Sequence, residues 1–394
     1  MVFNKTYPLY TVDCKGWEIV GSIKSKCTPD PVVEPIHVSV AYRHPRSGCI
    51  VSGHGGPVKY SREDNPTVLG LEARLAVLEN AGNLLAFNSG MAAISSLLLA
   101  EALEEQLIVP WEVYGGTSLL VKELSEHMKI RAIRVYPDTQ SIIDTLKPGS
   151  VVLLETMTNP TLKIVDVDEV IRASREMGST VIVDNTFATP ILYKPLDRGA
   201  DYSVESLTKY ISGHNDVLGG SVASNKDLSH VWKWRTLLGG IIQPAEAYLV
   251  ERGLKTLYLR FRKSSETAVA VAEYLEDHPM VEEVFYPGLS SSPYKKVADR
   301  LFTEKLYGGV VSFKVKGLTM SNVASYLSRL TLITPSPSLG GTESLMTYPV
   351  LSSSKYIPSD IRSKLGITEN LLRLSIGLED EQAVIEDLSR MLQQ

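Results

Sequence analysis

The sequence contains few cysteines and no long run of apolar residues. Its three cysteines, Cys14, Cys27 and Cys49, cannot all pair, and their spacing matches no metal-binding knuckle. We therefore expect reduced thiols, as is usual in the cytoplasm. No apolar run approaches the ~18 residues of a membrane-spanning helix. Residues 1–16 also lack a basic stretch followed by an apolar one, which argues against a secretory signal. These absences predict a cytoplasmic protein without a membrane span.

The sequence also carries little excess charge. Its net charge is −5 over 394 residues, so we expect no nucleic-acid surface, which normally requires a basic excess. The 7 histidines are scattered without ligand spacing, and we expect no metal site. At about 150 residues per domain, the length predicts two or three domains around a large core.

Changes in pattern along the chain predict three regions. Residues 1–60 are rich in proline, which removes backbone donors, so this stretch is expected to be an extended arm over a neighbouring subunit. Residues 61–252 alternate between helical and strand-like patterns and form a predicted large domain. Residues 253–394 begin with a long helical pattern, and strand-like segments at 310–315 and 371–377 follow, which predicts a smaller α/β domain.

Short apolar runs in the large domain predict buried strands. The runs lie at 151–155, 180–184 and 202–206, and the helical pattern at 167–178 separates the first two. Leucine spacing predicts another helix over 71–80, and residues 89–106 predict a helix capped by Ser89. Strands that alternate with helices indicate an α/β fold with a mostly parallel sheet and right-handed crossovers.

Polar residues stand where these strand-like runs end. Ligands of open parallel sheets bind outside the carboxyl ends of the strands, so these residues are informative. The runs lead into Asp184 and Thr186, into Ser206, Thr208 and Lys209, and into Thr156 to Asn159. A carboxylate, several hydroxyls and a lysine are therefore expected at one edge of the sheet.

Each of these residues alone has a simple structural explanation. A lysine after a strand is usually a solvated charge, an aspartate at a strand end is usually a cap, and Ser89 fits an ordinary helix start. Together they meet one requirement. A phosphorylated pyridine aldehyde needs a lysine for a Schiff base, an acid for its ring nitrogen, and a helix N-terminus with hydroxyls for its phosphate.

The sequence resembles the Cys/Met-metabolism enzymes that depend on pyridoxal phosphate. This family includes cystathionine γ-synthases, cystathionine γ- and β-lyases, methionine γ-lyases and O-acetylhomoserine sulfhydrylases. The resemblance extends in order and spacing from about Tyr60 to the C-terminus. The matching segments are 60–67 (YSREDNPT), 87–94 (FNSGMAAI), 114–117 (YGGT), 155–162 (ETMTNPTL), 183–220, 251–260 (ERGLKTLYLR), 286–289 (YPGL), 338–345 (SLGGTESL) and 373–380 (RLSIGLED).

The resemblance implies the type I fold of pyridoxal-phosphate-dependent transferases and a set of residue roles. Lys209 would form the Schiff base with pyridoxal 5'-phosphate and move protons, and Tyr114 would assist it. Asp184 would hold the ring nitrogen protonated. The expected cofactor contacts come from Tyr60, Arg62, Gly90, Met91, Tyr114, Asp184, Thr186, Ser206, Thr208 and Lys209. The expected substrate contacts come from Asn159, Ser338 and Arg373.

The same resemblance implies an oligomer with shared active sites. Tyr60 and Arg62 are expected to reach the phosphate bound by the adjacent subunit, so that an isolated monomer would be inactive. Two such dimers would form a homotetramer whose only other partner is a small amino-acid substrate.

The sequence departs from the family pattern around the outer part of the substrate site. Pro337 stands where synthases and γ-lyases usually carry a glutamate, and Gly116 stands where methionine γ-lyases carry a cysteine. Glu205 replaces a histidine, and residues 118–120 and 346–356 also differ. A proline supplies neither charge nor hydrogen bond to the distal amino group of a cystathionine-like substrate.

Three hypotheses on function follow. The leading one is a cystathionine γ-synthase or γ-lyase that performs γ-replacement or γ-elimination on a homoserine-derived or cystathionine substrate. An O-acetylhomoserine sulfhydrylase or methionine γ-lyase is the alternative, favoured by Pro337. A non-catalytic protein on the same fold would be expected to have lost Lys209, Asp184 or Arg373, and none is lost.

Overall fold

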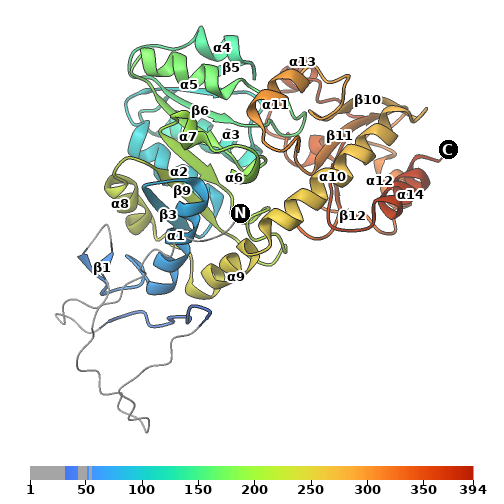
Figure 1. The fold of residues 1–394 in the computed structure, drawn as a ribbon. Coiled ribbons are helices and arrows are strands. Elements are labelled where there is room, and N and C mark those ends of the chain that lie inside the picture. The colour runs from blue at the N-terminus through green and yellow to red at the C-terminus, as the bar shows by residue number, and fades with distance from the viewer. Residues whose placement is uncertain (1–31, 43–50, 53–55, 394) are drawn as a thin grey trace.

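A computed structural model describes residues 32–42, 51–52 and 56–393 of the chain. Cys14, Cys27 and Cys49 and most of the predicted arm lie outside these residues. Two β-sheets, one of seven strands and one of five, form the centres of two lobes. Figure 1 shows the first lobe in blue through green to yellow and the second in orange to red, with the long helix α10 running from beside α9 into the second lobe.

The seven-stranded sheet has the order β3-β9-β8-β7-β6-β4-β5. Strands β8, β7, β6, β4 and β5 are mutually parallel, and β9 runs antiparallel to both of its neighbours. The mostly parallel sheet predicted from the apolar runs is therefore confirmed. The strands are β3 (Asn83–Phe87), β4 (Gln106–Pro110), β5 (Arg131–Val135), β6 (Val151–Glu155), β7 (Thr180–Asp184), β8 (Tyr202–Glu205) and β9 (Gly220–Ser224).

Helices cover both faces of this sheet, which explains why its strands are apolar throughout. In β6, Val152 and Leu154 belong to one hydrophobic cluster, and Val151 and Leu153 belong to another on the opposite face. Such double burial produces continuous apolar runs instead of alternation. The helices are α1 (Pro66–Glu79), α2 (Gly90–Glu101), α3 (Gly115–His127), α4 (Thr139–Ile143), α5 (Val167–Glu176), α6 (Thr189–Leu192), α7 (Pro195–Arg198), α8 (Ser229–Leu238) and α9 (Pro244–Leu254).

Two helix boundaries differ from those that the sequence predicts. Helix α1 begins before the predicted residue 71, because the side chain of Asn65 caps it and Pro66 suits the first helical position. Helix α2 ends at Glu101, whereas the helical pattern continues to Gln106. Gln106 instead begins β4, whose pairing with β5 and β6 overrides the local helix propensity.

The second sheet has the order β10-β11-β14-β13-β12 and carries the predicted strand at 310–315. The strand predicted at 371–377 is also present and ends at residue 375. The long helix predicted at its start is α10 (Leu257–Glu276). The predicted boundary after residue 252 falls near the end of α9, and the three-region division remains a prediction. The other elements are β10 (Val281–Phe285), α11 (Lys295–Leu301), β11 (Val310–Val315), α12 (Val323–Leu327), β12 (Thr334–Pro335), β13 (Leu345–Thr347), η1 (Pro349–Leu351), α13 (Ser359–Leu365), β14 (Leu371–Ser375) and α14 (Glu381–Leu392).

The described part of the arm is extended and lies against the start of α1. The His37 amide donates to Thr67 Oγ1 at 2.8 Å, and Asn65 Nδ2 donates to the His37 carbonyl at 2.8 Å. Two short strands, β1 (Val51–Ser52) and β2 (Gly56–Pro57), form a separate ribbon. Within the described residues, no helix is both long enough and apolar enough to cross a membrane.

Candidate active site

Lys209 follows β8 and is held partly buried between the two lobes. Its Nζ donates a hydrogen bond to Ser338 Oγ at 2.8 Å, and Ser338 belongs to the loop between β12 and β13. Burial, followed by the positive charge of Arg373, lowers the pKa of Lys209 to about 8. About a tenth of this amine is therefore neutral and nucleophilic at pH 7, far more than for an ordinary lysine.

Arg373 lies on β14 and faces the same space. Its Nη1 donates to Asn159 Oδ1 at 2.8 Å, and its Nη2 donates to the Ser338 carbonyl at 2.9 Å. The guanidinium is buried, which lowers the pKa of Arg373 to about 10, so it remains cationic at neutral pH. Its Nε is buried and has no hydrogen-bond partner among the described residues. The three predicted substrate-binding residues thus form one cluster beside Lys209.

Asp184 ends β7 at the same edge of the sheet. Its Oδ1 accepts hydrogen bonds from the Thr186 hydroxyl at 2.6 Å and from the Thr186 amide at 3.1 Å. Thr186 Oγ1 in turn accepts the Ser206 amide at 2.9 Å, so this hydroxyl joins the ends of β7 and β8. Burial raises the pKa of Asp184, and the Thr186 hydrogen bonds oppose that shift. A buried carboxylate of this kind is stabilised by a positive partner.

The N-terminus of α2 meets the end of β8. Ser89 caps the helix by accepting the Ala92 amide at 3.0 Å, as predicted from the sequence. A Cβ placed on Gly90 would lie 3.0 Å from Ser206 Cβ. The absence of a side chain therefore leaves the first turn of the helix open beside the Ser206 hydroxyl. Free amides at the positive end of a helix dipole form an anion-binding site.

Tyr114 lies at the start of α3 and covers this space from another side. Its ring and Met91 both approach Gly116, whose added Cβ would lie 2.6 Å from the Tyr114 ring and 3.0 Å from Met91 Sδ. The Tyr114 amide donates to Glu155 Oε1 at 2.5 Å. Burial, with the nearby charge of Asp184, raises the pKa of Glu155 well above its usual range. Tyr114 itself is 45% exposed, which leaves its ring accessible to a ligand.

Three predicted cofactor contacts lie away from Lys209 in the single chain, and for Tyr60 and Arg62 the prediction concerns the adjacent subunit. Arg62 Nη1 donates to the Thr236 carbonyl of α8 at 2.9 Å, and its guanidinium lies 5.4 Å from the centre of the Tyr60 ring. Both residues are exposed, and within the described residues Arg62 contacts α8 and the Tyr60 ring, and neither residue contacts Lys209. The Thr208 hydroxyl bonds the backbone of Gly219, accepting its amide at 3.0 Å and donating to its carbonyl at 3.3 Å.

Two buried glutamates near the site were not predicted to have a role. Glu155 could have been recognised, because it ends the strand-like run 151–155 just as Asp184 ends the next one. Glu205 was noted only as a departure from the family. It is buried without a hydrogen-bond partner among the described residues, and burial together with the charge of Glu79 raises its pKa well above the usual range.

These residues suit a phosphorylated pyridine aldehyde. Lys209 supplies a partly neutral amine, Asp184 supplies a carboxylate whose Oδ2 accepts no hydrogen bond from the described residues, and the open turn at Gly90 supplies amides for a phosphate. The buried Nε of Arg373 has no hydrogen-bond partner among the described residues, which leaves a donor that an acceptor such as a carboxylate would satisfy. The fold and the site define an enzyme that activates an amino acid through a lysine-bound aldehyde cofactor.

Comparisons with known proteins agree with this class. The family model described as Cys/Met metabolism PLP-dependent enzyme matches residues 19–393, and the chain belongs to this family. It is 36% identical to a cystathionine gamma-lyase from Dictyostelium discoideum over 369 residues, which cover 92% of each chain.

Solved structures extend the similarity to the fold. A cystathionine gamma lyase from Micromonospora echinospora is 39% identical, with a TM-score of 0.86 and coverage of 93% of this chain and 95% of its own. A cystathionine gamma synthase from Xanthomonas oryzae, in complex with cystathionine, is 36% identical with a TM-score of 0.85 and 92% coverage of both chains. The α/β fold and the pyridoxal-phosphate dependence predicted from the sequence are thereby confirmed.

Proposed function

We propose that the protein is a trans-sulfuration enzyme of the cystathionine γ-synthase or γ-lyase type, acting on cystathionine or a homoserine derivative. The observation that carries the proposal is the cluster of Arg373, Asn159 and Ser338 directly beside Lys209. This cluster offers a cationic fork for an α-carboxylate next to an amine suited to exchange with an α-amino group. The relatives named cystathionine gamma-lyase and gamma-synthase support the choice of substrate class.

The cofactor would be held by residues from three elements. Lys209 would bind the aldehyde carbon, and Asp184 would keep a proton on the ring nitrogen through the charge of its buried carboxylate. Gly90, Met91 and the Ser206 hydroxyl would donate to the phosphate, with Thr186 orienting Asp184. The Thr208 hydroxyl would join them by exchanging its 3.3 Å bond to the Gly219 carbonyl for the phosphate. The Tyr114 ring would cover the face of the cofactor ring.

Lys209 and Tyr114 would move the protons of the reaction. When bound, pyridoxal phosphate withdraws electrons from the substrate α-carbon, so that protons and a leaving group can depart. The Lys209 amine would take the α-proton, pass it on to the cofactor and, neutral again, take a β-proton, since burial and Arg373 favour its neutral form. Arg373 would hold the carboxylate so that the α-proton faces Nζ. The group that leaves Cγ, an acyloxy group or a thiol, would then be replaced by an incoming thiol, or water would be consumed as ammonia and a 2-oxo acid are released.

One observation favours a second candidate, an O-acetylhomoserine sulfhydrylase or methionine γ-lyase. Pro337 directly precedes Ser338 and is exposed at the mouth of the site. It offers no charge to the distal ammonium group of cystathionine. A substrate that ends in an uncharged thioether or acyl group would need no charged or hydrogen-bonding partner at this position.

A substrate panel separates the two candidates. The holoenzyme is incubated with cystathionine, with methionine, and with O-acetylhomoserine plus either cysteine or sulfide, and the products are identified. We expect turnover of cystathionine or its synthesis from the homoserine ester and cysteine. Turnover of methionine alone, or use of sulfide but not cysteine, would replace the leading proposal by the second candidate.

We also propose a homotetramer with active sites shared between subunits, located in the cytoplasm. The exposure of Tyr60 and Arg62 supports sharing, because their own chain leaves both side chains available to a neighbour. The described arm supports it further, since Val38 is 77% exposed and Val40 is 58% exposed in the single chain. Analytical ultracentrifugation of the holoenzyme tests the assembly, and a monomer would contradict it.

A further inference from the structure

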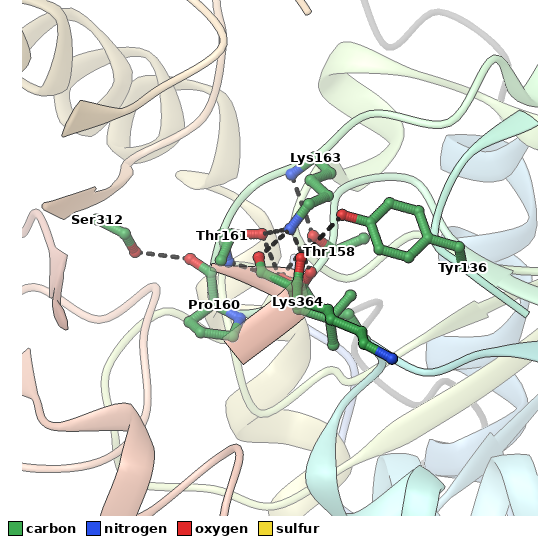
Figure 2. Close-up of polar contacts among 9 residues, drawn as sticks. Tyr136, Thr158, Pro160, Thr161, Lys163, Ser312 and Lys364 are labelled. Carbon is green, nitrogen blue, oxygen red and sulfur yellow. Dashed lines mark hydrogen bonds and ion pairs between the residues drawn. The ribbon is translucent and has the colours of Figure 1, made fainter. Parts of the chain in front are cut away.

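A buried ion pair outside the cofactor site holds the loop between β6 and α5. Lys163 Nζ lies 2.8 Å from Glu112 Oε2, and their side chains are only 9% and 0% exposed. Figure 2 shows Lys163 among Thr158 and Thr161, with dashed contacts converging on this position. Breaking such a pair leaves a buried charge without compensation, so its geometry is strongly enforced.

Glu112 is the centre of the network. Its Oε1 accepts hydrogen bonds from the Thr158 hydroxyl at 3.0 Å, from the Thr161 amide at 2.8 Å and from the Thr161 hydroxyl at 2.5 Å. The Thr158 hydroxyl also accepts the Lys163 amide at 3.0 Å. One carboxylate thus fixes the loop on both sides of residues 159 and 160.

The loop fixed in this way carries Asn159. Asn159 Oδ1 accepts the Arg373 Nη1 hydrogen bond at 2.8 Å, so its position sets one side of the guanidinium. Among the described residues, neither charged group of the Lys163–Glu112 pair contacts Arg373 or Lys209. The pair therefore acts on the substrate site through Asn159.

The same network reaches the second lobe. Lys163 Nζ donates to the Leu365 carbonyl of α13 at 2.7 Å. Ser312 of β11 donates to the Pro160 carbonyl at 2.6 Å, and Ser312 pairs with Arg373 in the sheet. Figure 2 shows the Ser312–Pro160 contact on the opposite side of the loop from Lys163. The loop is consequently held from both lobes, one of which carries Lys209 and the other Arg373.

We propose that the Lys163–Glu112 pair positions Asn159 and Arg373, and so determines how tightly the enzyme holds a substrate carboxylate. The proposal rests on the proposed role of Arg373 as the carboxylate ligand. A misplacement of about 1 Å in such a ligand weakens a productive contact substantially. Lys163 and Glu112 are positioning residues, because neither contacts the reacting atoms.

Two small amines isolate the carboxylate contact. Glycine and methylamine both carry an amine that can react with the cofactor, but only glycine has a carboxylate. Their dissociation constants are measured by calorimetry on the holoenzyme of wild type, Lys163→Met and Thr158→Val. Thr158→Val removes the hydrogen bond to Glu112 and the one from the Lys163 amide while leaving the ion pair. It provides a second test if Lys163→Met fails to fold. Lys129→Met is the matched control, because Lys129 forms an exposed pair with Glu104.

We expect glycine to bind about tenfold more weakly in Lys163→Met, and by a smaller factor in Thr158→Val, whereas methylamine binding stays unchanged in both. Lys129→Met should match the wild type for both amines. Equal weakening of glycine and methylamine, or no weakening in either variant, would overturn the proposal. If the wild type bound glycine no more tightly than methylamine, Arg373 would not be the carboxylate ligand, whichever substrate the enzyme uses.

Discussion

At the scale of single residues, Lys209 and its neighbours determine the chemistry. The amine lies between a hydroxyl that accepts its hydrogen bond and a guanidinium that disfavours its charge. Its lowered pKa gives the first prediction, because only the neutral amine can attack an aldehyde. We expect the rate of pyridoxal-phosphate uptake by the apoenzyme to rise with pH and to level off above about pH 8.

Stopped-flow absorbance of the apoenzyme over a pH series measures this rate. The sign follows from the direction of the shift, since a lowered lysine pKa moves the rise in rate to lower pH. A rise that continued to the pKa of an ordinary lysine would contradict the burial argument. Lys209→Ala, as the control, should show no covalent uptake at any pH.

Arg373 gives the second prediction. In Arg373→Lys the charge remains, but the fork that bonds Asn159 and the Ser338 carbonyl is lost. We expect KM for the amino-acid substrate to rise by about tenfold to a hundredfold. The absorbance of the bound cofactor should persist, because Arg373 is assigned to the substrate. Unchanged KM in steady-state kinetics would remove Arg373 from the carboxylate site.

At the scale of elements, the contact between α2 and β8 leads to the third prediction. Gly90→Ala would place a Cβ 3.0 Å from Ser206 Cβ and narrow the first turn of the helix. We expect an affinity for pyridoxal phosphate about tenfold lower, even though alanine favours helix formation by ~1 kcal/mol. Gly70→Ala in α1 is the control, because its new Cβ would approach only the Arg74 side chain, at 3.4 Å. Unchanged affinity in equilibrium titration of Gly90→Ala would exclude this turn as the phosphate site.

The proximity of Glu79, the last residue of α1, to Glu205, the last residue of β8, leads to the fourth prediction. Burial raises the pKa of Glu79 to about 7, and it raises the pKa of Glu205 as well. Lys194 lowers the pKa of Glu79, and the charges of Asp197 and Asp184 oppose ionisation of the pair. The folded protein therefore retains protons that the unfolded chain releases above its glutamate pKa. Stability should fall as pH rises from about 4.5 through about 7.

Glu205→Gln removes one of these ionisations. Calorimetric melting at about pH 5 and about pH 8 should show a smaller loss of stability in this variant, by on the order of 1 kcal/mol. Glu104→Gln serves as the control, because Glu104 lies on the surface. An equal loss of stability between the two pH values in Glu205→Gln and wild type would show that ionisation of Glu205 does not destabilise the fold.

Sequence patterns predicted the elements more successfully than their boundaries or the outer contacts. The strands at 151–155 and 180–184 were recovered because burial on both faces produces an unbroken apolar run. The end of α2 was missed, since sheet pairing at Gln106 is not local in the sequence. The residues at the carboxyl ends of the strands were predicted to gather there, but the Lys163–Glu112 network was not, because its partners are separated along the chain.

At the scale of the whole molecule, Tyr60 and Arg62 point to a shared active site. Arg62 contacts α8 and the Tyr60 ring of its own chain, and both residues remain exposed, so a neighbour could receive them. The fifth prediction is that inactive Arg62→Ala and inactive Lys209→Ala subunits, when mixed, regain part of the activity. Each mixed dimer would contain one site with both an intact lysine and an intact arginine. Mixed oligomers verified by mass spectrometry that stay inactive would exclude sharing.

The most direct test of the account is chemical reduction of the holoenzyme with sodium borohydride, followed by peptide mapping. Reduction turns the lysine–aldehyde bond into a stable secondary amine, so the labelled residue can be identified. The account predicts a single pyridoxyl label on Lys209. A label on another lysine, or no label on a protein saturated with cofactor, would contradict it.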